Sequence, residues 1–262
     1  MRRLLALASL ALVASCAPPS PETTARPSET VPPPGTARLP ETAPAGWSLA
    51  FTYTFDHLDT TVWSLGTHTF DGNAAQFRPY NAKIRHGHLE LTLEPDHLED
   101  RQFSGAELEL RQQYKYGRFE VRMRAAKGSA VISSWFGYAE PPWREIDIEV
   151  LGDHPTAVQS NVYNSPDANP TLIPPFPILR TLPFDATAGF HTYAFEWEPT
   201  ELRWYADTIL VARTTNASQV PTREMRPMLN LWLSTTSSWA GPIDPSALPV
   251  RSQYQWVRIY QR

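Results

Sequence analysis

Hydrophobic and polar residues alternate with a period of two through most of the chain after residue 47. Four segments show this pattern most clearly: residues 89–94, 106–111, 119–124 and 192–197. Such alternation predicts half-buried β-strands, because successive side chains of a strand point to opposite faces. Turn-forming pairs separate the segments, among them His86-Gly87, Lys127-Gly128, Pro199-Thr200 and Asp207-Thr208. Since no long stretch has a helical period, we predict an all-β fold, an antiparallel β-sandwich.

Two segments depart from the strand pattern. Residues 17–45 are rich in Pro, Thr, Ser and Glu and contain almost no large apolar residue, so we predict an extended tether that buries no core. Residues 165–184 combine several prolines with large apolar side chains. Proline rules out a central strand there. This loop therefore either covers an edge or a face of the sheet, or forms one wall of a cleft.

The N-terminus has the features of an export signal. Residues 1–15, MRRLLALASLALVAS, place two arginines before a short apolar stretch that ends in small residues, as in a secretory signal peptide. This stretch is too short to span a bilayer core of roughly 30 Å. Val13-Ala14-Ser15-Cys16 resembles the lipobox of bacterial lipoproteins, which implies cleavage before Cys16 and acylation of that residue. An ordinary signal peptide with an incidental cysteine is the alternative.

These features divide the chain into three regions. We predict a lipoprotein signal peptide over residues 1–15, a lipidated Cys16 with its tether over 16–45, and one folded domain over 46–262. The protein would then be exported and anchored to the bacterial cell envelope, on the outer membrane or the outer face of the cell membrane. Only the lipid would contact the membrane. No cysteine besides Cys16 is left for a disulfide.

Composition excludes some partners and leaves others open. The formal charge of −4 over 262 residues gives no electrostatic reason to expect a nucleic acid. Aromatic residues make up 11% of the chain and either fill the core or line a binding cleft. The seven histidines have no metal-ligand spacing, and His86-Gly87-His88 is interpreted as a hairpin turn. We predict no metal site and no cofactor.

The strongest chemical signal is WREIDIEVLG, residues 143–152. In a strand, Glu145, Asp147 and Glu149 share one face, and the intervening apolar residues share the other. A solvated charged face is the simplest interpretation. Against it, no Lys or Arg interrupts the row, and neighbouring carboxylates raise one another's pKa. Retaining glycosidases use two carboxyl groups roughly 5 Å apart. The outer Cα atoms lie about 13 Å apart in a strand, so that geometry requires a concave sheet.

Glu145-Ile146-Asp147-Ile148-Glu149 resembles the active-site signature of glycoside hydrolase family 16. Further segments are similar to the same family, especially to bacterial lichenases: residues 115–138, GFHTYAFEWEP, LRWYAD and MLNLWL. The resemblance extends over residues 51–260. It implies a jelly-roll (concanavalin A-like) sandwich with a concave substrate-binding sheet, and hydrolysis with retention. By position it implies that Glu145 is the nucleophile, Asp147 the assisting acid and Glu149 the acid/base.

The resemblance also implies contacts with sugar. The candidate substrate-binding residues are Trp143, Glu107, Asn161, Tyr163, Asn230, Trp232, Trp239, Asn73 and Phe136. For each aromatic residue, core packing is the alternative. Three positions depart from the family. Glu109 stands where lichenases tend to have Arg, and Arg144 replaces an acidic or small polar residue. Gln255 replaces an Asp that helps to hold a structural calcium in relatives, so no calcium is predicted.

We therefore predict a monomeric, retaining endo-glycosidase that cleaves a β-glucan, most readily mixed-linkage β-1,3-1,4-glucan. A second hypothesis is a transglycosylase or a depolymerase of another polysaccharide, such as xyloglucan or bacterial exopolysaccharide. A third is a lectin-like module that binds carbohydrate without turnover. The intact row of carboxylates disfavours the third, because binding alone does not need two flanking glutamates.

Overall fold

The computed structural model describes residues 43–97, 101–166 and 174–262. The strands are β1 (Ser48–Thr54), β2 (Trp63–Leu65), β3 (Ala75–Phe77), β4 (Ala82–Arg85), β5 (His88–Pro95), β6 (Phe103–Leu110), β7 (Gly117–Arg124), β8 (Val131–Ala139), β9 (Arg144–Leu151), β10 (Ala157–Asn164), β11 (Ile178–Thr181), β12 (His191–Glu198), β13 (Glu201–Ala206), β14 (Ile209–Thr214), β15 (Arg226–Leu233) and β16 (Val250–Gln261). Helices in these ranges are short: α1 (Ser237–Ala240), η1 (Pro79–Asn81), η2 (Ala217–Gln219) and η3 (Pro245–Ala247).

The predicted export features fall on a part of the chain that is not described. The signal peptide, Cys16 and the tether as far as residue 42 lie outside the described residues. Within the described ranges, no helix is long and apolar enough to cross a bilayer.

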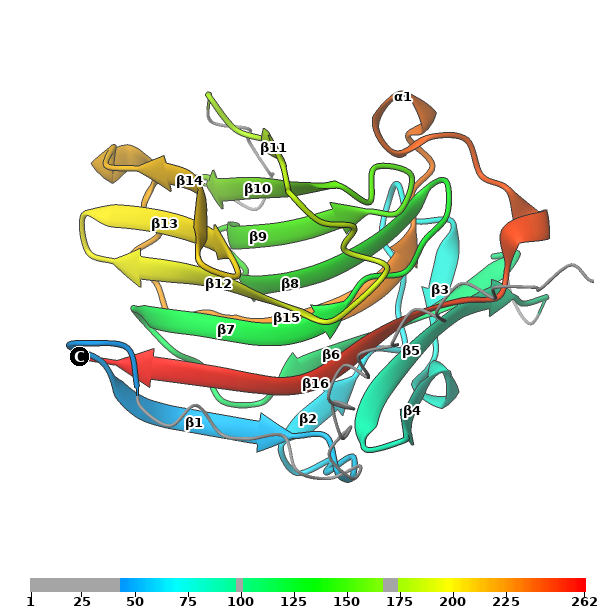
Figure 1. Ribbon diagram of the computed structural model, residues 1–262, viewed down its shortest axis with the longest axis horizontal. Helices are drawn as coiled ribbons and strands as arrows, with labels where there is room; N and C mark the ends of the chain where they lie inside the picture. Colours follow the sequence, from blue (N-terminus) through cyan, green and yellow to red (C-terminus); the bar gives the residue numbers. More distant parts are fainter. Residues whose placement is uncertain (1–42, 98–100, 167–173) are drawn as a thin grey trace, which may run out of the picture. The chain divides into compact units, whose positions relative to one another are not determined.

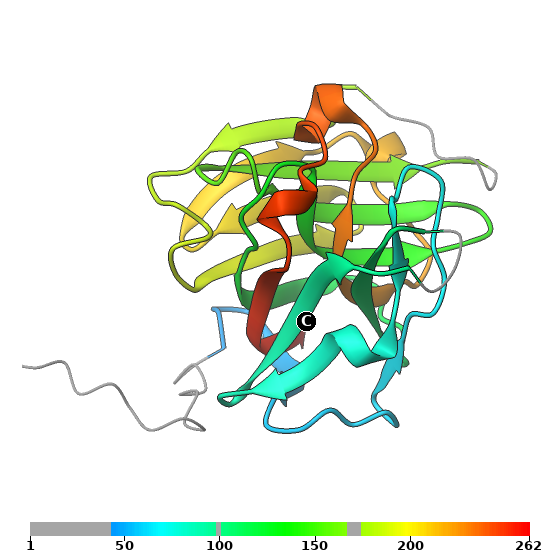
Figure 2. The same ribbon diagram turned by 90° about the vertical axis from the view of Figure 1, so that its right-hand side faces the viewer.

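The strands pair into two sheets (Figure 1). The first sheet has the order β11-β10-β9-β8-β15-β6, and β2 also pairs with β6. The second sheet continues from it as β5-β16-β7-β12-β13-β14, with β1 on β16 and β4 on β5. Among the described strands, only the short β3 pairs in parallel, with β6. β4 and β5 lie at the end that faces the viewer in Figure 2. The all-β antiparallel sandwich predicted from the alternation is confirmed.

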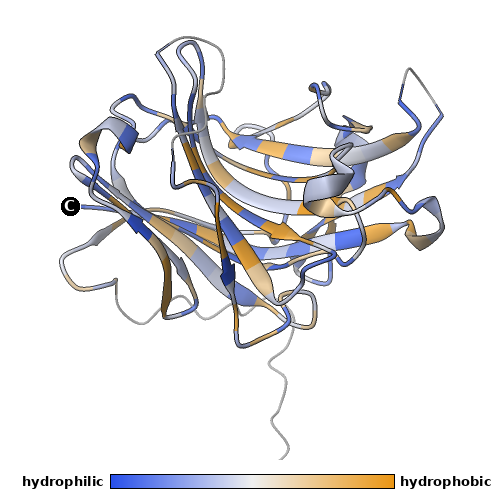
Figure 3. Ribbon diagram, turned by 90° about the horizontal axis from the view of Figure 1, so that it is seen from above, coloured by the Kyte–Doolittle hydropathy of each residue, from blue (hydrophilic) through white to orange (hydrophobic). Residues whose placement is uncertain are grey.

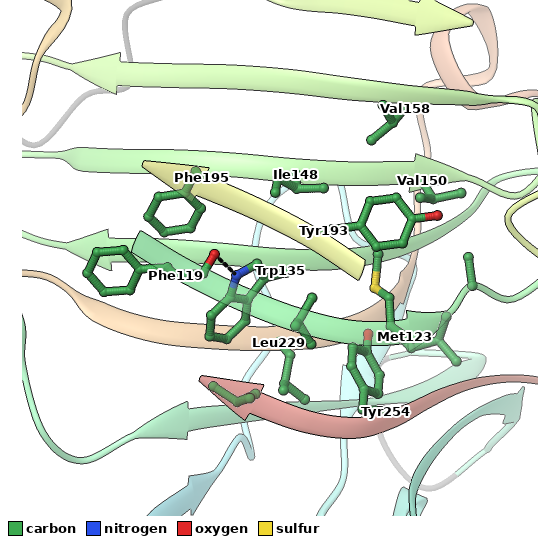
Figure 4. Packing of buried hydrophobic residues seen from close by; sticks show 14 of the residues in the cluster. Phe119, Met123, Trp135, Ile148, Val150, Val158, Tyr193, Phe195, Leu229 and Tyr254 are labelled. Atoms are coloured by element: carbon green, nitrogen blue, oxygen red, sulfur yellow. Dashed lines mark hydrogen bonds between the residues drawn. The ribbon is translucent and has the colours of Figure 1, made fainter. Parts of the chain in front are cut away.

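The two sheets bury their apolar faces against each other (Figure 4). Trp135 and Ile148 come from the first sheet, and Phe119 and Phe195 come from the second; all four are at most 2% exposed. The rings of Phe119 and Phe195 stack with centroids 4.8 Å apart, and the Trp135 indole donates to the Phe119 carbonyl at 3.4 Å. Burying each such side chain contributes about 1.5–3 kcal/mol. Because Ile148 points into this core, its neighbours on β9 must point out of it.

The outward faces of the two sheets differ in their electrostatics. Hydrophilic and hydrophobic residues alternate along many strands in Figure 3. On the second sheet the outward charges are paired: Arg118 contacts Glu120 at 2.6 Å and Glu196 at 2.8 Å, and Arg203 contacts Glu196 at 2.6 Å. On the first sheet, no described Lys or Arg forms an ion pair with the carboxylates of β9. The row of carboxylates is therefore not part of a charge-paired surface.

The proline-rich loop divides into a described and an undescribed part. β11 forms the edge of the first sheet and pairs with β10, which agrees with the exclusion of a central strand. Phe176 is 5% exposed and packs on Trp204 with ring centroids 5.2 Å apart. The Gln219 side chain donates to the Pro174 carbonyl at 2.7 Å. The described part thus covers a sheet edge and the core. The other alternative, a cleft wall, stays a prediction, because residues 167–173 of this loop lie outside the described residues.

Candidate active site

The register of the first sheet places Glu145, Asp147 and Glu149 on its outward face. Residues directly opposite each other on antiparallel strands project from the same face. The partners on β10 and β8 are Gln159 and Ser134 for Glu149, Asn161 and Phe136 for Asp147, and Tyr163 and Tyr138 for Glu145. The carboxylates are therefore surrounded by amides, hydroxyls and aromatic rings on the strands at both sides.

One row of polar side chains continues from Glu149 across the sheet. Ser134 lies opposite Asn230 on β15, which in turn lies opposite Glu107 on β6. Gly66 follows as the next position, where its amide donates to the Glu107 carbonyl at 2.9 Å. We call Gln159, Glu149, Ser134, Asn230 and Glu107 the polar row. It crosses five strands, so it can contact a ligand longer than one sugar ring.

Two hydrogen bonds orient Glu145. The Trp143 indole donates to Oε2 of Glu145 at 2.7 Å, and the Asp147 carboxyl donates a second hydrogen bond. The Trp143 ring is itself held edge-on by Tyr138 at 5.3 Å and by Tyr163 at 6.3 Å between centroids. Glu145 therefore has a fixed position with donors on two sides.

Glu149 receives one hydrogen bond from the neighbouring strand. The Gln159 side-chain amide donates to Oε2 of Glu149 at 2.8 Å. The carbonyl oxygen of the same amide accepts from the Trp239 indole at 2.9 Å. Glu149 and Glu145 are both half-buried, whereas Asp147 between them is buried.

Burial is the largest cause that raises the pKa of each of the three carboxyls above its ordinary value. The pKa of Asp147 lies well above its ordinary value, because the charges of Glu145 and Glu149 add to the effect of its burial. The hydrogen bonds from Trp143 and Asp147 lower the pKa of Glu145, and the one from Gln159 lowers that of Glu149. If all three carboxyls were ionised, their negative charges would repel one another strongly. A proton held by Asp147 and donated to Glu145 opposes the effect of burial on the pKa of Glu145 and favours its ionised form.

Glu107 forms a second acidic position on the same face. It is 5% exposed, accepts from the Asn230 amide at 3.3 Å and has the His68 imidazole 3.6 Å away. Burial raises the pKa of Glu107 to about 7. A Cβ on Gly66 would lie 3.0 Å from the Glu107 Cβ. Any larger residue at position 66 would therefore press on this glutamate.

The polar row contains buried atoms that have no protein partner. Ser134 is 3% exposed and Asn230 is 4% exposed. Ser134 Oγ and Asn230 Oδ1 have no hydrogen-bond partner among the described residues. Buried polar groups are nearly always hydrogen-bonded, so such atoms call for a polar ligand. Hydroxyl groups, which both donate and accept, suit a row of this composition.

Aromatic rings stand at one end of this face. Trp232 lies two residues from Asn230. Its ring packs edge-on against Phe70 at 5.1 Å and lies tilted against Trp239 at 5.9 Å between centroids. Phe70 is 37% exposed. We call Trp232, Phe70 and Trp239 the aromatic wall. Flat rings beside a polar row are the arrangement that suits a sugar ring, which has apolar faces and a polar rim.

The structure brings most of the predicted contact residues together. Trp143, Glu107, Asn161, Tyr163, Asn230 and Phe136 lie in or next to the rows of the three carboxylates, and Trp232 and Trp239 form the aromatic wall. Asn73 differs. It is fully buried, and its Oδ1 accepts from the amides of Ala75 at 2.9 Å and Leu233 at 3.3 Å. Its side chain holds backbone near the wall and presents no exposed amide.

Sequence reasoning missed several residues of the site. Gln159 lies two positions before Asn161 on β10, so extending the same alternation would have found it. The approach of His68 and Phe70 depends on the loop between β2 and β3, for which the sequence has no repeating pattern. The departure at Glu109 also has a spatial explanation: the Arg226 guanidinium lies 3.2 Å from its carboxylate. The two residues form an ion pair on the same face.

The absence of a metal stays a prediction, and the surroundings of Gln255 bear on it. Among the described residues, no group of three His, Cys, Asp or Glu side chains is placed to hold one. Gln255 stands where relatives have a calcium ligand, and its side-chain oxygen accepts from the Arg122 guanidinium at 2.9 Å. A guanidinium at this distance is unfavourable for a calcium ion.

Comparison with known proteins identifies a family whose model matches most of the chain. The model of "Glycosyl hydrolases family 16" matches residues 71–258. A β-glucanase of Bacillus subtilis (strain 168) is 40% identical over 156 residues, which are 58% of this chain and 61% of the relative. A β-glucanase of Bacillus licheniformis is 33% identical over 216 residues, 79% of this chain and 84% of the relative. The alignments span about three fifths of the length of the first curated relatives.

Solved structures agree with these sequences. A prokaryotic β-1,3-1,4-glucanase (lichenase) from a mouse hindgut metagenome superposes with a TM-score of 0.73 at 32% identity, covering 80% of this chain and 97% of that one. The Bacillus licheniformis β-glucanase superposes with a TM-score of 0.72 at 32% identity, covering 81% and 98%. The likeness therefore extends over about four fifths of this chain and nearly the whole of each solved structure.

Proposed function

The chain belongs to glycoside hydrolase family 16, and from this premise we propose that it is a retaining endo-glycosidase of β-glucan. The observation that carries the proposal is the arrangement on β9. Glu145 is held by Trp143 and Asp147, and Glu149 is held by Gln159 on the same face. These are two carboxyls with different donors, as a nucleophile and an acid/base require.

Hydrolysis then proceeds in two steps. In the first, the ionised Glu145 carboxylate attacks the anomeric carbon while Glu149 gives its proton to the departing glycosidic oxygen. A covalent glycosyl-enzyme forms and the shortened glycan leaves. In the second, Glu149, now ionised, takes a proton from a water molecule whose oxygen attacks the same carbon and releases Glu145. Each step inverts the anomeric carbon, so the overall reaction retains its configuration.

Asp147 assists by holding a proton between the two glutamates. Its hydrogen bond to Glu145 stabilises the ionised nucleophile before attack and weakens as charge leaves that carboxylate in the ester. Trp143 supplies the second donor on Glu145. A protonated Asp147 also avoids a third negative charge next to Glu149.

The polar row and the aromatic wall support a glycan as substrate. Ser134 Oγ and Asn230 Oδ1 are buried atoms that hydroxyl groups can satisfy, and Phe70, which is 37% exposed in the aromatic wall, offers a ring for stacking. Several relatives above 30% identity are described as β-glucanases, one solved structure as a β-1,3-1,4-glucanase, and a further relative as a xylanase/β-glucanase. We infer that mixed-linkage β-1,3-1,4-glucan is the preferred substrate.

One observation favours a second candidate. The Glu109–Arg226 ion pair lies on the substrate face, where lichenases tend to have a single Arg. A changed charge at that position favours a different glycan, so the alternative is hydrolysis or transglycosylation of another polysaccharide, such as xyloglucan or bacterial exopolysaccharide. A panel of mixed-linkage glucan, β-1,3-glucan and xyloglucan separates the two candidates by the substrate with the highest kcat/KM.

The first products from mixed-linkage glucan should be short oligosaccharides in the β configuration. Proton NMR recorded before mutarotation checks this, because the two carboxyl groups of a retaining pair sit about 5–5.5 Å apart and leave no room for an inverting water. Endo action is expected to lower the viscosity of the glucan before much reducing sugar appears. An α anomer first would contradict the role of Glu145. Binding without cleavage of any glycan would favour the lectin hypothesis.

The location of the protein in the cell is proposed from the sequence, because the signal peptide, Cys16 and most of the tether lie outside the described residues. We propose that the chain is exported and that Cys16 carries lipid, because the lipobox-like sequence ends at the single cysteine. Two or more acyl chains hold a protein on a membrane far more firmly than one. Cys16→Ser should move the protein out of the membrane fraction, or stall its processing, with kcat/KM of the domain unchanged. Mass spectrometry that finds an unmodified Cys16 would exclude the anchor.

A further inference from the structure

A chain of two hydrogen bonds connects α1 to Glu149. The Trp239 indole donates to Oε1 of Gln159 at 2.9 Å, and Nε2 of Gln159 donates to Oε2 of Glu149 at 2.8 Å. Gln159 is 6% exposed, so solvent does not readily replace either bond. Three elements contribute one member each: α1, β10 and β9.

Trp239 determines which way the Gln159 amide points. A side-chain amide has an acceptor oxygen on one side and a donor nitrogen on the other, whereas an indole N–H only donates. The oxygen of Gln159 must therefore face Trp239, which leaves the nitrogen to face Glu149. Reversing the amide would place its nitrogen against the indole N–H and its oxygen against the carboxylate, losing both hydrogen bonds.

The backbone and the packing fix Trp239 in turn. Its amide donates to the Thr236 carbonyl at 3.0 Å, and its ring lies 5.9 Å from that of Trp232. Gln159 is fixed by its place directly opposite Glu149 in the β9–β10 ladder. The two hydrogen bonds thus join elements that are held independently of each other.

We propose that Trp239 is a positioning residue for the acid/base: by orienting the Gln159 amide, it sets how strongly Glu149 retains its proton. The inference rests on the proposed function for the role of Glu149, but the hydrogen bonds themselves do not. Trp239 acts through Gln159 and need not touch the reacting atoms. This role is distinct from the sugar contact expected for Trp239 in the aromatic wall.

The direction of the effect follows from the donor. A hydrogen bond donated to a carboxylate stabilises the ionised form and lowers its pKa, which opposes the effect of burial on Glu149. The first step needs Glu149 protonated and the second needs it ionised. We call the two hydrogen bonds from Trp239 through Gln159 to Glu149 the relay. With the relay intact, Glu149 loses its proton at a lower pH. Without it, Glu149 keeps the proton to a higher pH and becomes less available as a base.

Other ionisable groups near Glu149 come from two strands. Glu145 and Asp147 lie on β9 with Glu149, and Tyr163 lies on β10. The partner on β8 is Ser134, and α1 presents Trp239; neither titrates in the working range. The β15 and β6 members of the polar row add only Glu107, whose charge acts on Glu145. All of these groups remain when Trp239 is replaced, so their effect on the pKa of Glu149 is the same in the parent and in the variant.

Trp239→Phe should move the alkaline limb of the kcat/KM profile upward by about one pH unit. Loss of one hydrogen bond to a charged group has an effect of that size. Phenylalanine keeps a ring for stacking, so we expect only a small change in KM beside this shift of the alkaline limb. Gln159→Met, which removes the amide at similar length, should give a similar shift. The double variant should shift no further than Gln159→Met alone, because both changes remove the same bond to Glu149.

Trp232→Phe is the matched control. It removes an indole N–H from the neighbouring ring of the aromatic wall, but that indole has no hydrogen bond to Gln159. The alkaline limb of the kcat/KM profile of Trp232→Phe should therefore coincide with that of the parent protein, even if KM changes. A higher KM with an unmoved limb in Trp239→Phe would overturn the proposal and leave Trp239 as a sugar contact. Should Trp239→Phe fail to fold, an unmoved limb in Gln159→Met would overturn it equally.

A second measurement does not depend on turnover. Carbon-13 NMR of protein labelled at the glutamate carboxyls follows the titration of Glu149, whose signal is identified by its loss in Glu149→Gln. Its midpoint should be higher in Trp239→Phe than in the parent. If the protein cleaves no glycan but the midpoint moves, the proposed function fails and the relay stands. If the midpoint is unchanged, the relay is overturned even in an active enzyme.

Discussion

Glu145→Ala is expected to lower kcat on β-glucan by on the order of 10⁶-fold, the size of loss seen when the nucleophile of a covalent catalytic unit is removed. No side chain near Glu145 can replace it. Asp147 is buried and holds its proton, and Tyr163 lies on the neighbouring strand with a pKa that burial raises above its ordinary value. Initial rates with mixed-linkage glucan measure the loss. Circular dichroism and thermal unfolding of the variant check that the sandwich is intact.

Azide distinguishes a lost nucleophile from a damaged fold. In Glu145→Ala, azide can enter the space of the missing carboxylate and attack the anomeric carbon while Glu149 still protonates the departing oxygen. With an activated β-glycoside, the product should be the α-glycosyl azide, because a single displacement inverts the configuration. Tyr163→Phe is the matched control: it keeps Glu145, so azide should give no α-azide. A β-azide from Glu145→Ala would mean that the roles of Glu145 and Glu149 are exchanged.

Side-chain alternation predicted the faces of β9 correctly for a simple physical reason. A strand has a period of two, so burial of Ile146 and Ile148 at 0% and 1% exposure forces the three acidic residues to the other side. The same reasoning separates two neighbouring aromatic residues on β8. Trp135 pairs directly with Ile148 and is fully buried, whereas its neighbour Phe136 pairs with Asp147 on the site face. Composition alone could not decide which aromatic residues fill the core and which line the binding face.

Contacts between distant segments were beyond the sequence. The relay from Trp239 to Gln159 joins residues that are 80 positions apart, and no local pattern encodes their meeting. Asn73 was expected at the sugar because of the resemblance, yet its carbonyl oxygen is used by backbone amides of two separate strands. The Glu109–Arg226 pair is similar: the departure at Glu109 was visible in the sequence, but the guanidinium that accompanies it required the β6–β15 pairing.

Glu149→Ala should lower turnover of β-glucan by roughly 10²–10⁴-fold, the contribution of a general acid, while an activated aryl β-glycoside should keep much of its first step. Its phenolate leaves without a proton, so Glu145 can still form the covalent intermediate. Release then becomes limiting, because water lacks its base. Azide needs no base, attacks the intermediate on the face opposite Glu145, and should raise the steady-state rate with the β-glycosyl azide as product.

Gln159→Met is the control for that experiment. It removes the hydrogen bond to Glu149 but leaves the carboxyl in place, so turnover of glucan should persist with a shifted pH profile, and azide should not raise the rate. The two variants therefore separate the loss of the acid/base from the loss of its orientation. If Glu149→Ala loses activity on the aryl glycoside and on glucan by the same factor, Glu149 does not protonate the leaving group. If azide yields the α product, Glu145 is not the nucleophile, and the two-step mechanism on β9 is wrong.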